Sequence, residues 1–287
     1  MQQTRLPTAF TRPECLHQPQ NLAAMLAPFV AFAQALAQEA AQMLQAQATQ
    51  ALGTSVKADK TFVTELDLAI EQRLRERINT RYPQHGIYGE EFGIERLDAE
   101  WVWTLDPIDG TMAMVAGIPV YSTLIALAQH GKPVVGVMHF HATKETWLGV
   151  AGQRTTCNGV VCTTRSGAGL HDAIQSASNP DFFTTPHERR ALTALSSNTA
   201  WRVFGAAAMS YGRLSAGRID VAIDAGLKVY DYAPFVPIIQ GAGGTITDWQ
   251  GQALTLHSGS CVLAAGDVRR HQAALAVIAT ARDDVNG

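Results

Sequence analysis

The chain has 287 residues, of which 47% are hydrophobic and 16% charged, and its formal net charge is −3. This composition is typical of a folded globular enzyme and excludes an intrinsically disordered chain. No overall basic field of the kind that attracts nucleic acid is present, so we do not expect nucleic acid as a partner.

The four cysteines are scattered along the chain and form no Cys-x-x-Cys pair. We therefore expect neither a structural zinc site nor a disulfide framework, and we expect the protein in the reducing cytoplasm. The most apolar segment, Leu22–Ala37, contains Pro28 and Gln34 and is too short to span a bilayer. It also lacks the clean basic start of a signal peptide, so we expect no association with a membrane.

Three prolines and little periodicity predict an irregular arm over residues 1–20. Good helix formers run through residues 21–52 and predict one long helix that ends at Gly53. Its apolar positions recur at roughly helical spacing, which indicates packing on the core or on a second subunit. In the polar connector that follows, Lys57 and Lys60 form either a flap over a bound phosphate or an ordinary solvated loop.

A second helix is predicted over residues 64–80. Thr64 is its N-cap candidate, and Asp67 three residues later gives a pattern close to a capping box. Farther along this helix, Glu71 and Arg75 have the i,i+4 spacing of a helical ion pair.

The central stretch of the chain begins with a short aromatic and β-branched run, Trp101–Leu105, which predicts a buried strand. Pro107 biases the residue before it away from the α conformation, so we expect the strand to stop there. Gly110 permits a sharp turn, and Thr111 is expected to cap a short helix.

This turn carries two carboxylates, Asp106 and Asp109, beside backbone N–H groups at a helix start. Carboxylates hold hard cations such as Mg²⁺, and N–H groups at a helix start hold phosphate. The pattern therefore indicates metal-assisted phosphate chemistry, although an acidic turn that only caps a helix has the same appearance.

The rest of the chain divides into two kinds of pattern. Alternating runs at 121–128, 133–140 and 146–150, with a hairpin signal at Gly131-Lys132, predict an antiparallel meander. From about residue 170 strands and helices alternate, which predicts an α/β lobe. The expected strands there are 173–177, 201–204, 220–223, 245–249 and 261–264, and the expected helices are 186–196, 206–216, 231–241 and 268–281. We divide the chain accordingly into a first lobe, 21–165, and a second lobe, 166–287, with the site between them.

Other acidic residues stand where predicted elements begin or end, which is where a site could collect them. Glu90 and Glu91 follow a predicted strand at 86–88, Asp67 lies in the first turn of a helix, and Asp231 opens another. Taken singly, each has an ordinary explanation as a solvated charge or as a partner of the helix dipole.

Their order along the chain decides between these interpretations. The segments Val63–Asp67, Gly89–Glu91, Asp106–Thr111 (Asp-Pro-Ile-Asp-Gly-Thr) and Tyr230-Asp231, the last followed by Ala242-Gly243-Gly244, resemble the inositol monophosphatase family over about residues 22–275. The resemblance implies an α+β, layered αβαβα sandwich of the inositol monophosphatase and fructose-1,6-bisphosphatase type. It also implies a homodimer and Mg²⁺-dependent hydrolysis of a small phosphate monoester.

The resemblance further implies a role for each matching residue. Two or three Mg²⁺ ions would be held by Glu90, Asp106, the carbonyl of Ile108, Asp109 and Asp231. Asp67, Glu90 and Thr111 would form the catalytic set, and the N–H groups of Gly110 and Thr111 would hold the phosphate. Physical reasoning agrees, because divalent cations neutralise the phosphate and lower the pKa of a bound water, so that no side-chain nucleophile is needed.

Within the family, the segment Gly226–Pro237 is most similar to the histidinol-phosphate phosphatase branch. Three features depart from that branch: Met112-Ala113-Met114 after the central motif, alanines including Ala207 near Gly205, and Asp224 where a Glu is usual. Asp224 and Ala207 are the expected substrate contacts. We predict histidinol phosphate as the substrate, with inositol monophosphate or another sugar phosphate as the alternative.

Two further alternatives stay open. A non-catalytic protein-binding or RNA-binding regulator has the same fold, although four converging carboxylates repel one another and have no physical role without a metal. His139 and His141 lie at i,i+2 on one face of a predicted strand. They would suit a metal site, but no third ligand is close in sequence, so surface or edge positions are favoured.

Overall fold

The computed structural model of the protein describes residues 19–47, 54–56 and 62–283. The predicted arm up to residue 18, the helix stop at Gly53, and Lys57 and Lys60 lie outside these described residues.

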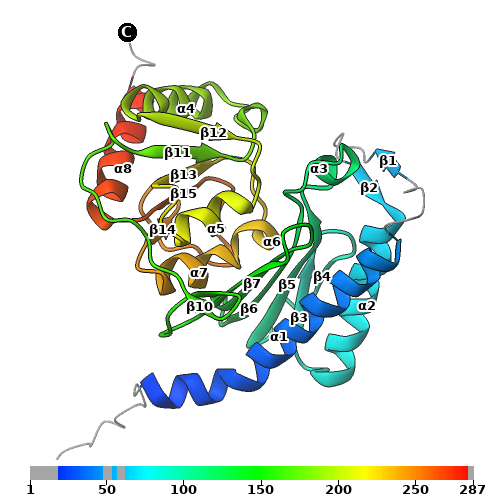
Figure 1. Ribbon diagram of the computed structural model, residues 1–287. Coiled ribbons are helices and arrows are strands. Elements are labelled where there is room, and N and C mark those ends of the chain that lie inside the picture. Colours follow the sequence, from blue (N-terminus) through cyan, green and yellow to red (C-terminus); the bar gives the residue numbers. More distant parts are fainter. Residues whose placement is uncertain (1–18, 48–53, 57–61, 284–287) are drawn as a thin grey trace, which may run out of the picture.

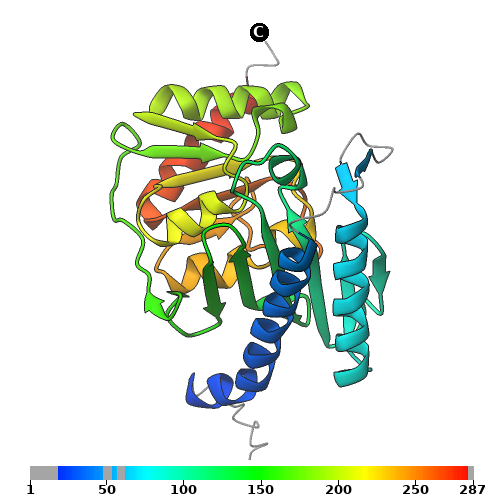
Figure 2. The same ribbon diagram turned by 45° about the vertical axis from the view of Figure 1, so that its right-hand side comes forward.

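The fold is a stack of five layers that alternate between helices and sheets (Figure 1 and Figure 2). The first layer is α1 and α2, the middle layer is α5, α6 and α7, and the last layer is α4 and α8. The helices are α1 (Pro19–Gln47), α2 (Glu65–Arg81), α3 (Thr111–Val115), α4 (Pro186–Asn198), α5 (Met209–Ser215), α6 (Val229–Tyr232), α7 (Phe235–Gly241) and α8 (Val268–Asp283). A short 3₁₀ turn, η1, covers Pro180–Phe182. This arrangement confirms the expected αβαβα sandwich.

The first sheet has eight strands in the order β10-β9-β8-β7-β6-β5-β3-β4, and only its β3–β5 pair is parallel. Its strands are β3 (Gly86–Gly89), β4 (Gly93–Glu95), β5 (Trp101–Asp109), β6 (Ser122–Gln129), β7 (Lys132–Phe140), β8 (Glu145–Val150), β9 (Thr156–Cys157) and β10 (Val160–Val161). The predicted meander is thus confirmed. A separate hairpin, β1 (Thr54–Val56) with β2 (Phe62–Thr64), stands where a connector was expected.

The second sheet is mixed and has the order β12-β11-β13-β15-β14. Its strands are β11 (Ile174–Ala177), β12 (Trp201–Phe204), β13 (Val221–Asp224), β14 (Thr245–Thr247) and β15 (Val262–Ala265). The expected helix over 231–241 is wrong in detail, because the chain forms α6 and then α7, with Pro234 as the N-cap of α7. Asp231 therefore lies in the first turn of α6 instead of opening a long helix.

Three apolar clusters of the described residues hold the five layers together. One joins α1 and α2 to the eight-stranded sheet, a second fills the space between the two sheets, and a third lies under α4 and α8. Burial of this apolar surface is the main force that holds the layers together. The middle cluster brings α5 and α6 of the second lobe against the first sheet, which places Asp231 beside the end of β5.

The N-terminal helix corrects one expectation about membranes. By length and composition alone, Leu22–Ala46 in α1 is long and apolar enough to cross a bilayer, although a core helix of a soluble protein passes the same test. One face of α1, which includes Leu26 and Leu36, is fully buried in the core cluster of the first lobe. We interpret α1 as a core helix, and the absence of a membrane partner stays a prediction.

Candidate functional site

The centre of the site is a bulge at the end of β5. The strand does not stop before Pro107, as expected, but continues to Asp109. Asp106 pairs with Leu124 and Asp109 with Ser122, so β5 carries one extra residue at this point. Pro107 is tolerated there because it lies in the bulge, between the two paired residues, where its missing N–H removes no ladder bond. Its carbonyl accepts a bond from Thr123 Oγ1 at 2.7 Å.

Gly110 makes the turn from β5 into α3. Its φ of 78° lies in the left-handed region, which costs a residue with a side chain more than it costs glycine. Gly110 is the N-cap, and Thr111 is the first helical residue, so the expected cap by Thr111 is wrong. The Thr111 hydroxyl instead donates to the carbonyl of Ile108 at 2.9 Å.

Asp67 faces this turn from the start of α2. The predicted capping box is present, since Asp67 Oδ2 accepts bonds from the N–H of Thr64, at 2.8 Å, and from its hydroxyl. The other oxygen, Oδ1, lies 3.4 Å from Thr111 Oγ1. The cap thus fixes Asp67, which is fully buried, with one oxygen directed to Thr111.

The second lobe contributes to the same place through α5 and α6. The N–H of Ala208 donates to Asp109 Oδ2 at 3.1 Å, which joins the two lobes directly at the site. Ala207 has a φ of 45°, and its Cβ lies within 4 Å of the position that a Cβ on Gly110 would occupy. Asp231 accepts a bond from the N–H of Lys228 at 2.6 Å.

The carboxylates at this boundary act on one another strongly. Burial raises the pKa of Asp106 well above its usual range, and the negative charges of four neighbours raise it further. These neighbours are Glu90, Asp109, Asp231 and Asp67. Burial likewise raises the pKa of Asp109, which settles at about 6 because bonds from Ala208 and Ser122 oppose the shift. The structure therefore brings together the acids that the sequence places far apart.

This donor set suits a hard cation. Asp106 is buried, and its Oδ1 atom has no hydrogen-bond partner. Unpaired buried oxygens are costly, and Mg²⁺ prefers oxygen ligands of this kind. Among the described residues no three His, Cys, Asp or Glu side chains are already arranged to hold an ion, so binding requires adjustment of the carboxylates. The residues fit Mg²⁺ because they supply oxygen donors and because their clustered negative charges are stabilised by a cation.

Asp224 is fully buried in this structure, and its role as a substrate contact stays a prediction. Its side chain has no exposed surface and accepts bonds from Ser178 N–H at 2.7 Å and from Tyr211 Oη at 2.9 Å. Burial raises its pKa to about 7, although these bonds oppose the shift. The negative charge of Asp109 also raises the pKa of Asp224, so the two carboxylates act on each other directly.

His139 of β7 and His141, just after that strand, bond threonines and not the candidate carboxylates. His139 bonds Thr146 Oγ1 through Nδ1 at 2.8 Å, and His141 bonds Thr123 Oγ1 through Nε2 at 3.0 Å. Both rings are half-buried rather than at the surface or the sheet edge, as was expected. Each ring is used to order neighbouring strands.

Sequence reasoning missed several partners of the site. Ser122, Ala208 and Tyr211 bond the candidate acids, but a backbone N–H or an ordinary hydroxyl gives no pattern in a sequence. The Glu71–Arg75 pair was expected only as a helical ion pair, which the 2.8 Å contact confirms. Its further contacts depend on the tertiary structure.

Comparison with known proteins agrees with this geometry. A family model described as "Inositol monophosphatase family" matches residues 25–286. The chain belongs to the inositol monophosphatase family. Members of this family are metal-dependent phosphatases, and the chain is a phosphoric monoester hydrolase.

Individual relatives differ in the ester that their names specify. The chain is 37% identical to the chloroplastic bifunctional phosphatase IMPL2 of Arabidopsis thaliana, over 86% of this chain and 74% of that protein. It is 34% identical to a histidinol-phosphatase of Mycobacterium tuberculosis, over 75% of this chain and 84% of the relative. It is 32% identical to the inositol-1-monophosphatase ImpA of Mycolicibacterium smegmatis, over 77% and 82% of the two chains.

A solved structure of a family member has the same fold. An inositol monophosphatase from Zymomonas mobilis superposes with a TM-score of 0.80 at 34% identity, and the match covers 88% of this chain and 98% of that one. The family resemblance inferred from four short segments thus extends over nearly the whole fold.

Proposed function

We propose that the protein hydrolyses a small phosphate monoester with two or three Mg²⁺ ions and a metal-activated water. The observation that carries this proposal is the convergence of five acids from both lobes on one bulged turn, with Asp106 Oδ1 left without a partner. Glu90, Asp106, the Ile108 carbonyl, Asp109 and Asp231 would hold the ions. When bound, Mg²⁺ supplies positive charge for the phosphate and lowers the pKa of the attacking water.

Asp67 and Thr111 orient that water. The single hydroxyl proton of Thr111 has two acceptors within reach, the Ile108 carbonyl at 2.9 Å and Asp67 Oδ1 at 3.4 Å. When the carbonyl is used as a ligand, the hydroxyl turns its proton to Asp67 and leaves a lone pair for the water. The water proton can then pass through Thr111 to Asp67 while the water oxygen bonds to phosphorus and the bond from phosphorus to the ester oxygen breaks. The departing alkoxide takes its proton from solvent water.

The phosphate would rest at the N-terminus of α3, against the N–H groups of Gly110 and Thr111. The first N–H groups of a helix have no acceptor within the helix, and they suit an anion. Ala207 lies next to Gly110 and would contact the ester from the second lobe. Its short side chain leaves room for the leaving group.

For the substrate we infer histidinol phosphate, with inositol monophosphate or another sugar phosphate as the alternative. Support comes from the likeness to a histidinol-phosphatase, at 34% identity. The inositol alternative is supported by the relative at 32% identity. We also expect a homodimer in the cytoplasm.

A phosphate-release assay separates these substrates. The purified protein with Mg²⁺ is given histidinol phosphate, inositol 1-phosphate, fructose 1,6-bisphosphate and adenosine 3′,5′-bisphosphate, and each reaction is repeated with EDTA. We expect the highest kcat/KM with histidinol phosphate and no release with EDTA. If another ester gives the highest kcat/KM, that ester and not histidinol phosphate is the substrate. Full activity in EDTA would disprove the metal mechanism.

A regulator without catalytic activity is the second candidate, because the chain is 32% identical over 218 residues to a protein named Nus factor SuhB from Pasteurella multocida. The Asp109→Asn variant distinguishes the two functions. We expect it to lose phosphate release and to fail to complement a strain that lacks the protein. Full complementation by a variant that releases no phosphate would favour the binding role.

A further inference from the structure

The turn that carries Glu90 is built around a buried carboxylate from another element. Glu71 of α2 has no exposed surface. Its Oε2 accepts a bond from the N–H of Glu91 at 2.7 Å, and its Oε1 accepts one from the N–H of Phe92 at 3.1 Å. The two residues after Glu90 are therefore bound by their backbone to a single side chain.

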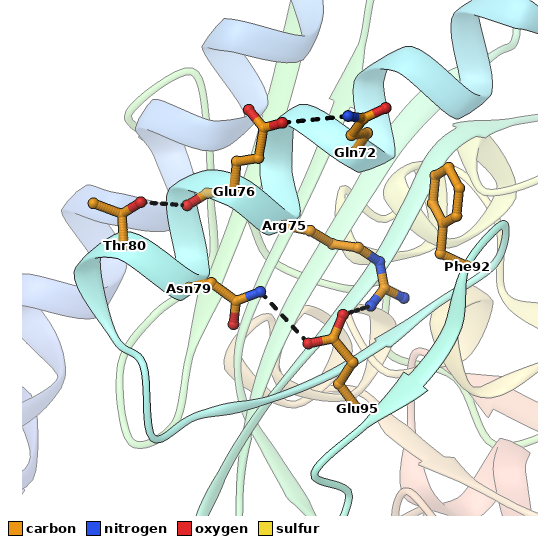
Figure 3. Close-up of a pocket in the computed structure, with 7 residues that line it drawn as sticks. All are labelled: Gln72, Arg75, Glu76, Asn79, Thr80, Phe92 and Glu95. Atoms are coloured by element: carbon orange, nitrogen blue, oxygen red, sulfur yellow. Dashed lines mark hydrogen bonds and ion pairs between the residues drawn. The ribbon is translucent and has the colours of Figure 1, made fainter.

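Arg75 supports Glu71 and closes the turn from the other side. Its Nε donates to Glu71 Oε1 at 2.8 Å, and its Nη1 donates to Glu95 Oε1 at 2.7 Å. Its Nη2 donates to the carbonyl of Gly93, at the start of β4. Figure 3 shows the guanidinium between α2 and the β3–β4 hairpin, with Glu95 and Phe92 beside it.

The side of the turn before Glu90 is constrained as well. The N–H of Glu90 donates to the carbonyl of Leu105 on β5 at 3.1 Å. A Cβ on Gly89 would lie 2.0 Å from Glu71 Oε1 and 2.7 Å from an Arg75 nitrogen, so only glycine allows this close approach. Glu90 is thus held between β5 on one side and the Glu71 carboxylate on the other.

We propose that Glu71 and Arg75 are positioning residues that fix Glu90 for metal binding. This inference rests on the proposed function, because it assigns Glu90 to the metal site. Asp67 and Glu71 lie one helical turn apart on α2, so one rigid helix would set both the water-orienting acid and the turn that carries Glu90. Loss of such a supporting group typically weakens metal affinity about 10- to 100-fold.

The test compares Mg²⁺ binding with folding in matched variants. Glu71→Gln leaves one acceptor oxygen for three N–H donors and directs an amide NH₂ group at another donor. Arg75→Met removes the guanidinium, and Arg75→Lys keeps the charge. The control is Arg73→Met, which removes a partly exposed arginine of the same helix that forms ion pairs with Glu39 and Glu76.

Mg²⁺ affinity is measured by calorimetry without substrate, and kcat and the Mg²⁺ concentration for half-maximal rate are measured in parallel with Tm. We expect about 10- to 100-fold weaker Mg²⁺ binding in Glu71→Gln and Arg75→Met. Arg75→Lys should recover part of the affinity, and Arg73→Met should stay within about twofold of wild type. At saturating Mg²⁺, kcat should approach the wild-type value, because Asp67 and Thr111 are unchanged.

Unchanged Mg²⁺ affinity in Glu71→Gln together with a lower Tm would overturn the proposal, since the pair would then only stabilise the fold. If Glu71→Gln does not fold, the comparison of Arg75→Lys with Arg73→Met decides in the same way. Wild-type protein that binds Mg²⁺ but hydrolyses no ester disproves the proposed function alone. Wild-type protein that binds no Mg²⁺ disproves both.

Discussion

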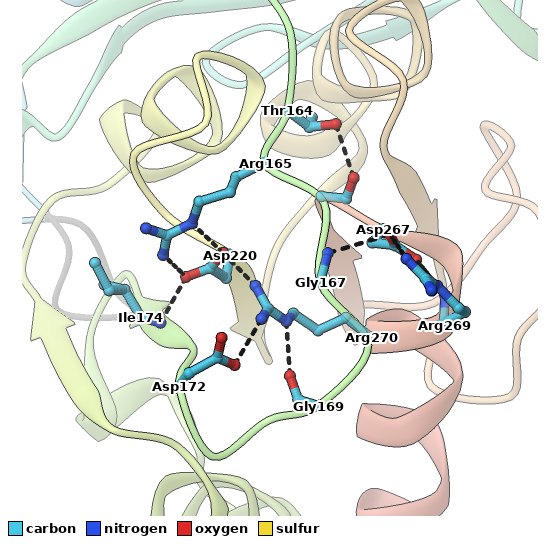
Figure 4. A network of polar contacts seen from close by, with 11 residues as sticks. Thr164, Arg165, Gly167, Gly169, Asp172, Ile174, Asp220, Asp267, Arg269 and Arg270 are labelled. Carbon is cyan, nitrogen blue, oxygen red and sulfur yellow. Dashed lines mark hydrogen bonds and ion pairs between the residues drawn. The ribbon is translucent and has the colours of Figure 1, made fainter.

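Two buried aspartates of this protein have opposite surroundings. Asp220, at the start of β13, has no exposed surface, and two arginines meet it: Arg165 Nε donates at 2.8 Å, and Arg270 donates through Nη1 (Figure 4). Although burial alone raises its pKa, bonds from Arg165 and the N–H of Ile174 and the charge of Arg270 keep that pKa below the usual range.

Asp106 is also buried, but its neighbours are acids. Burial and the negative charges of these acids both raise the pKa of Asp106. Arginine side chains of the protein thus neutralise Asp220, whereas the charged groups that shift the pKa of Asp106 are acids. A bound cation would neutralise Asp106. A buried charge with protein partners is structural, whereas a buried charge among like charges indicates a ligand. Four predictions test this difference.

The largest effect is expected for Asp106→Asn. Removal of this proposed metal ligand should lower kcat/KM at least about 10³-fold, which corresponds to about 4 kcal/mol. The metal-free variant should have an equal or higher Tm than the wild type, because one buried charge and its repulsion are gone. The measurement is phosphate release with Mg²⁺, beside thermal unfolding in EDTA. If Asp106→Asn has a much lower Tm than the wild type in EDTA, Asp106 stabilises the fold as Asp220 does.

Asp220→Asn should give the reverse result. It removes the buried partner of Arg270, whose other ion pair is with the largely exposed Asp172. Loss of one partner of a buried pair typically costs about 3–5 kcal/mol in the free energy of unfolding. The folded fraction should keep its kcat and its Mg²⁺ affinity. Urea unfolding gives the free energy, and Arg269→Ala is the control, because its pair with Asp267 is exposed and worth less than about 1 kcal/mol. A selective loss of Mg²⁺ binding would contradict a purely structural role.

Thr111→Val should lower kcat about 10²-fold, or about 2.7 kcal/mol, with little change in Mg²⁺ affinity. The reason is that the variant keeps the shape of the side chain but removes the hydroxyl between the Ile108 carbonyl and Asp67. Thr111→Ser keeps the hydroxyl and should retain most of the rate. Equal losses in both variants would show that the methyl group, and not the hydroxyl, is required.

The smallest effect is on stability as a function of pH. Asp109 has a pKa of about 6 in the fold, above its unfolded value of about 3.8, so the folded state binds more protons between these values. In EDTA, stability should therefore fall as pH rises from about 4 to 6, by on the order of 1–2 kcal/mol.

Asp220 has the opposite sign, because its lowered pKa means that its contribution is lost as pH falls below about 4. Added Mg²⁺ should raise Tm more at pH 7.5 than at pH 5, since the ligands must be deprotonated. The measurement is Tm against pH with EDTA or Mg²⁺. A stabilisation by Mg²⁺ that does not depend on pH would remove Asp109 from the ligand set.

Much of the fold could be predicted from local patterns. The capping box at Thr64, the hairpin at Gly131-Lys132 and the alternation of the second lobe are confirmed, because each depends on residues close in sequence. The continuation of β5 through Pro107 was missed, since a bulge is stabilised by the neighbouring β6. The break between α6 and α7 was missed for a similar reason.

The sequence by itself determined the family and the order of the candidate acids, because short motifs such as Asp106–Thr111 carry the turn and the proposed ligands together. Only the tertiary structure decided that Asp106 is buried among other acids, that Asp224 is enclosed by Ser178 and Tyr211, and that Glu71 holds the turn of Glu90. Burial and charge balance depend on contacts between distant elements, and a linear pattern does not contain them.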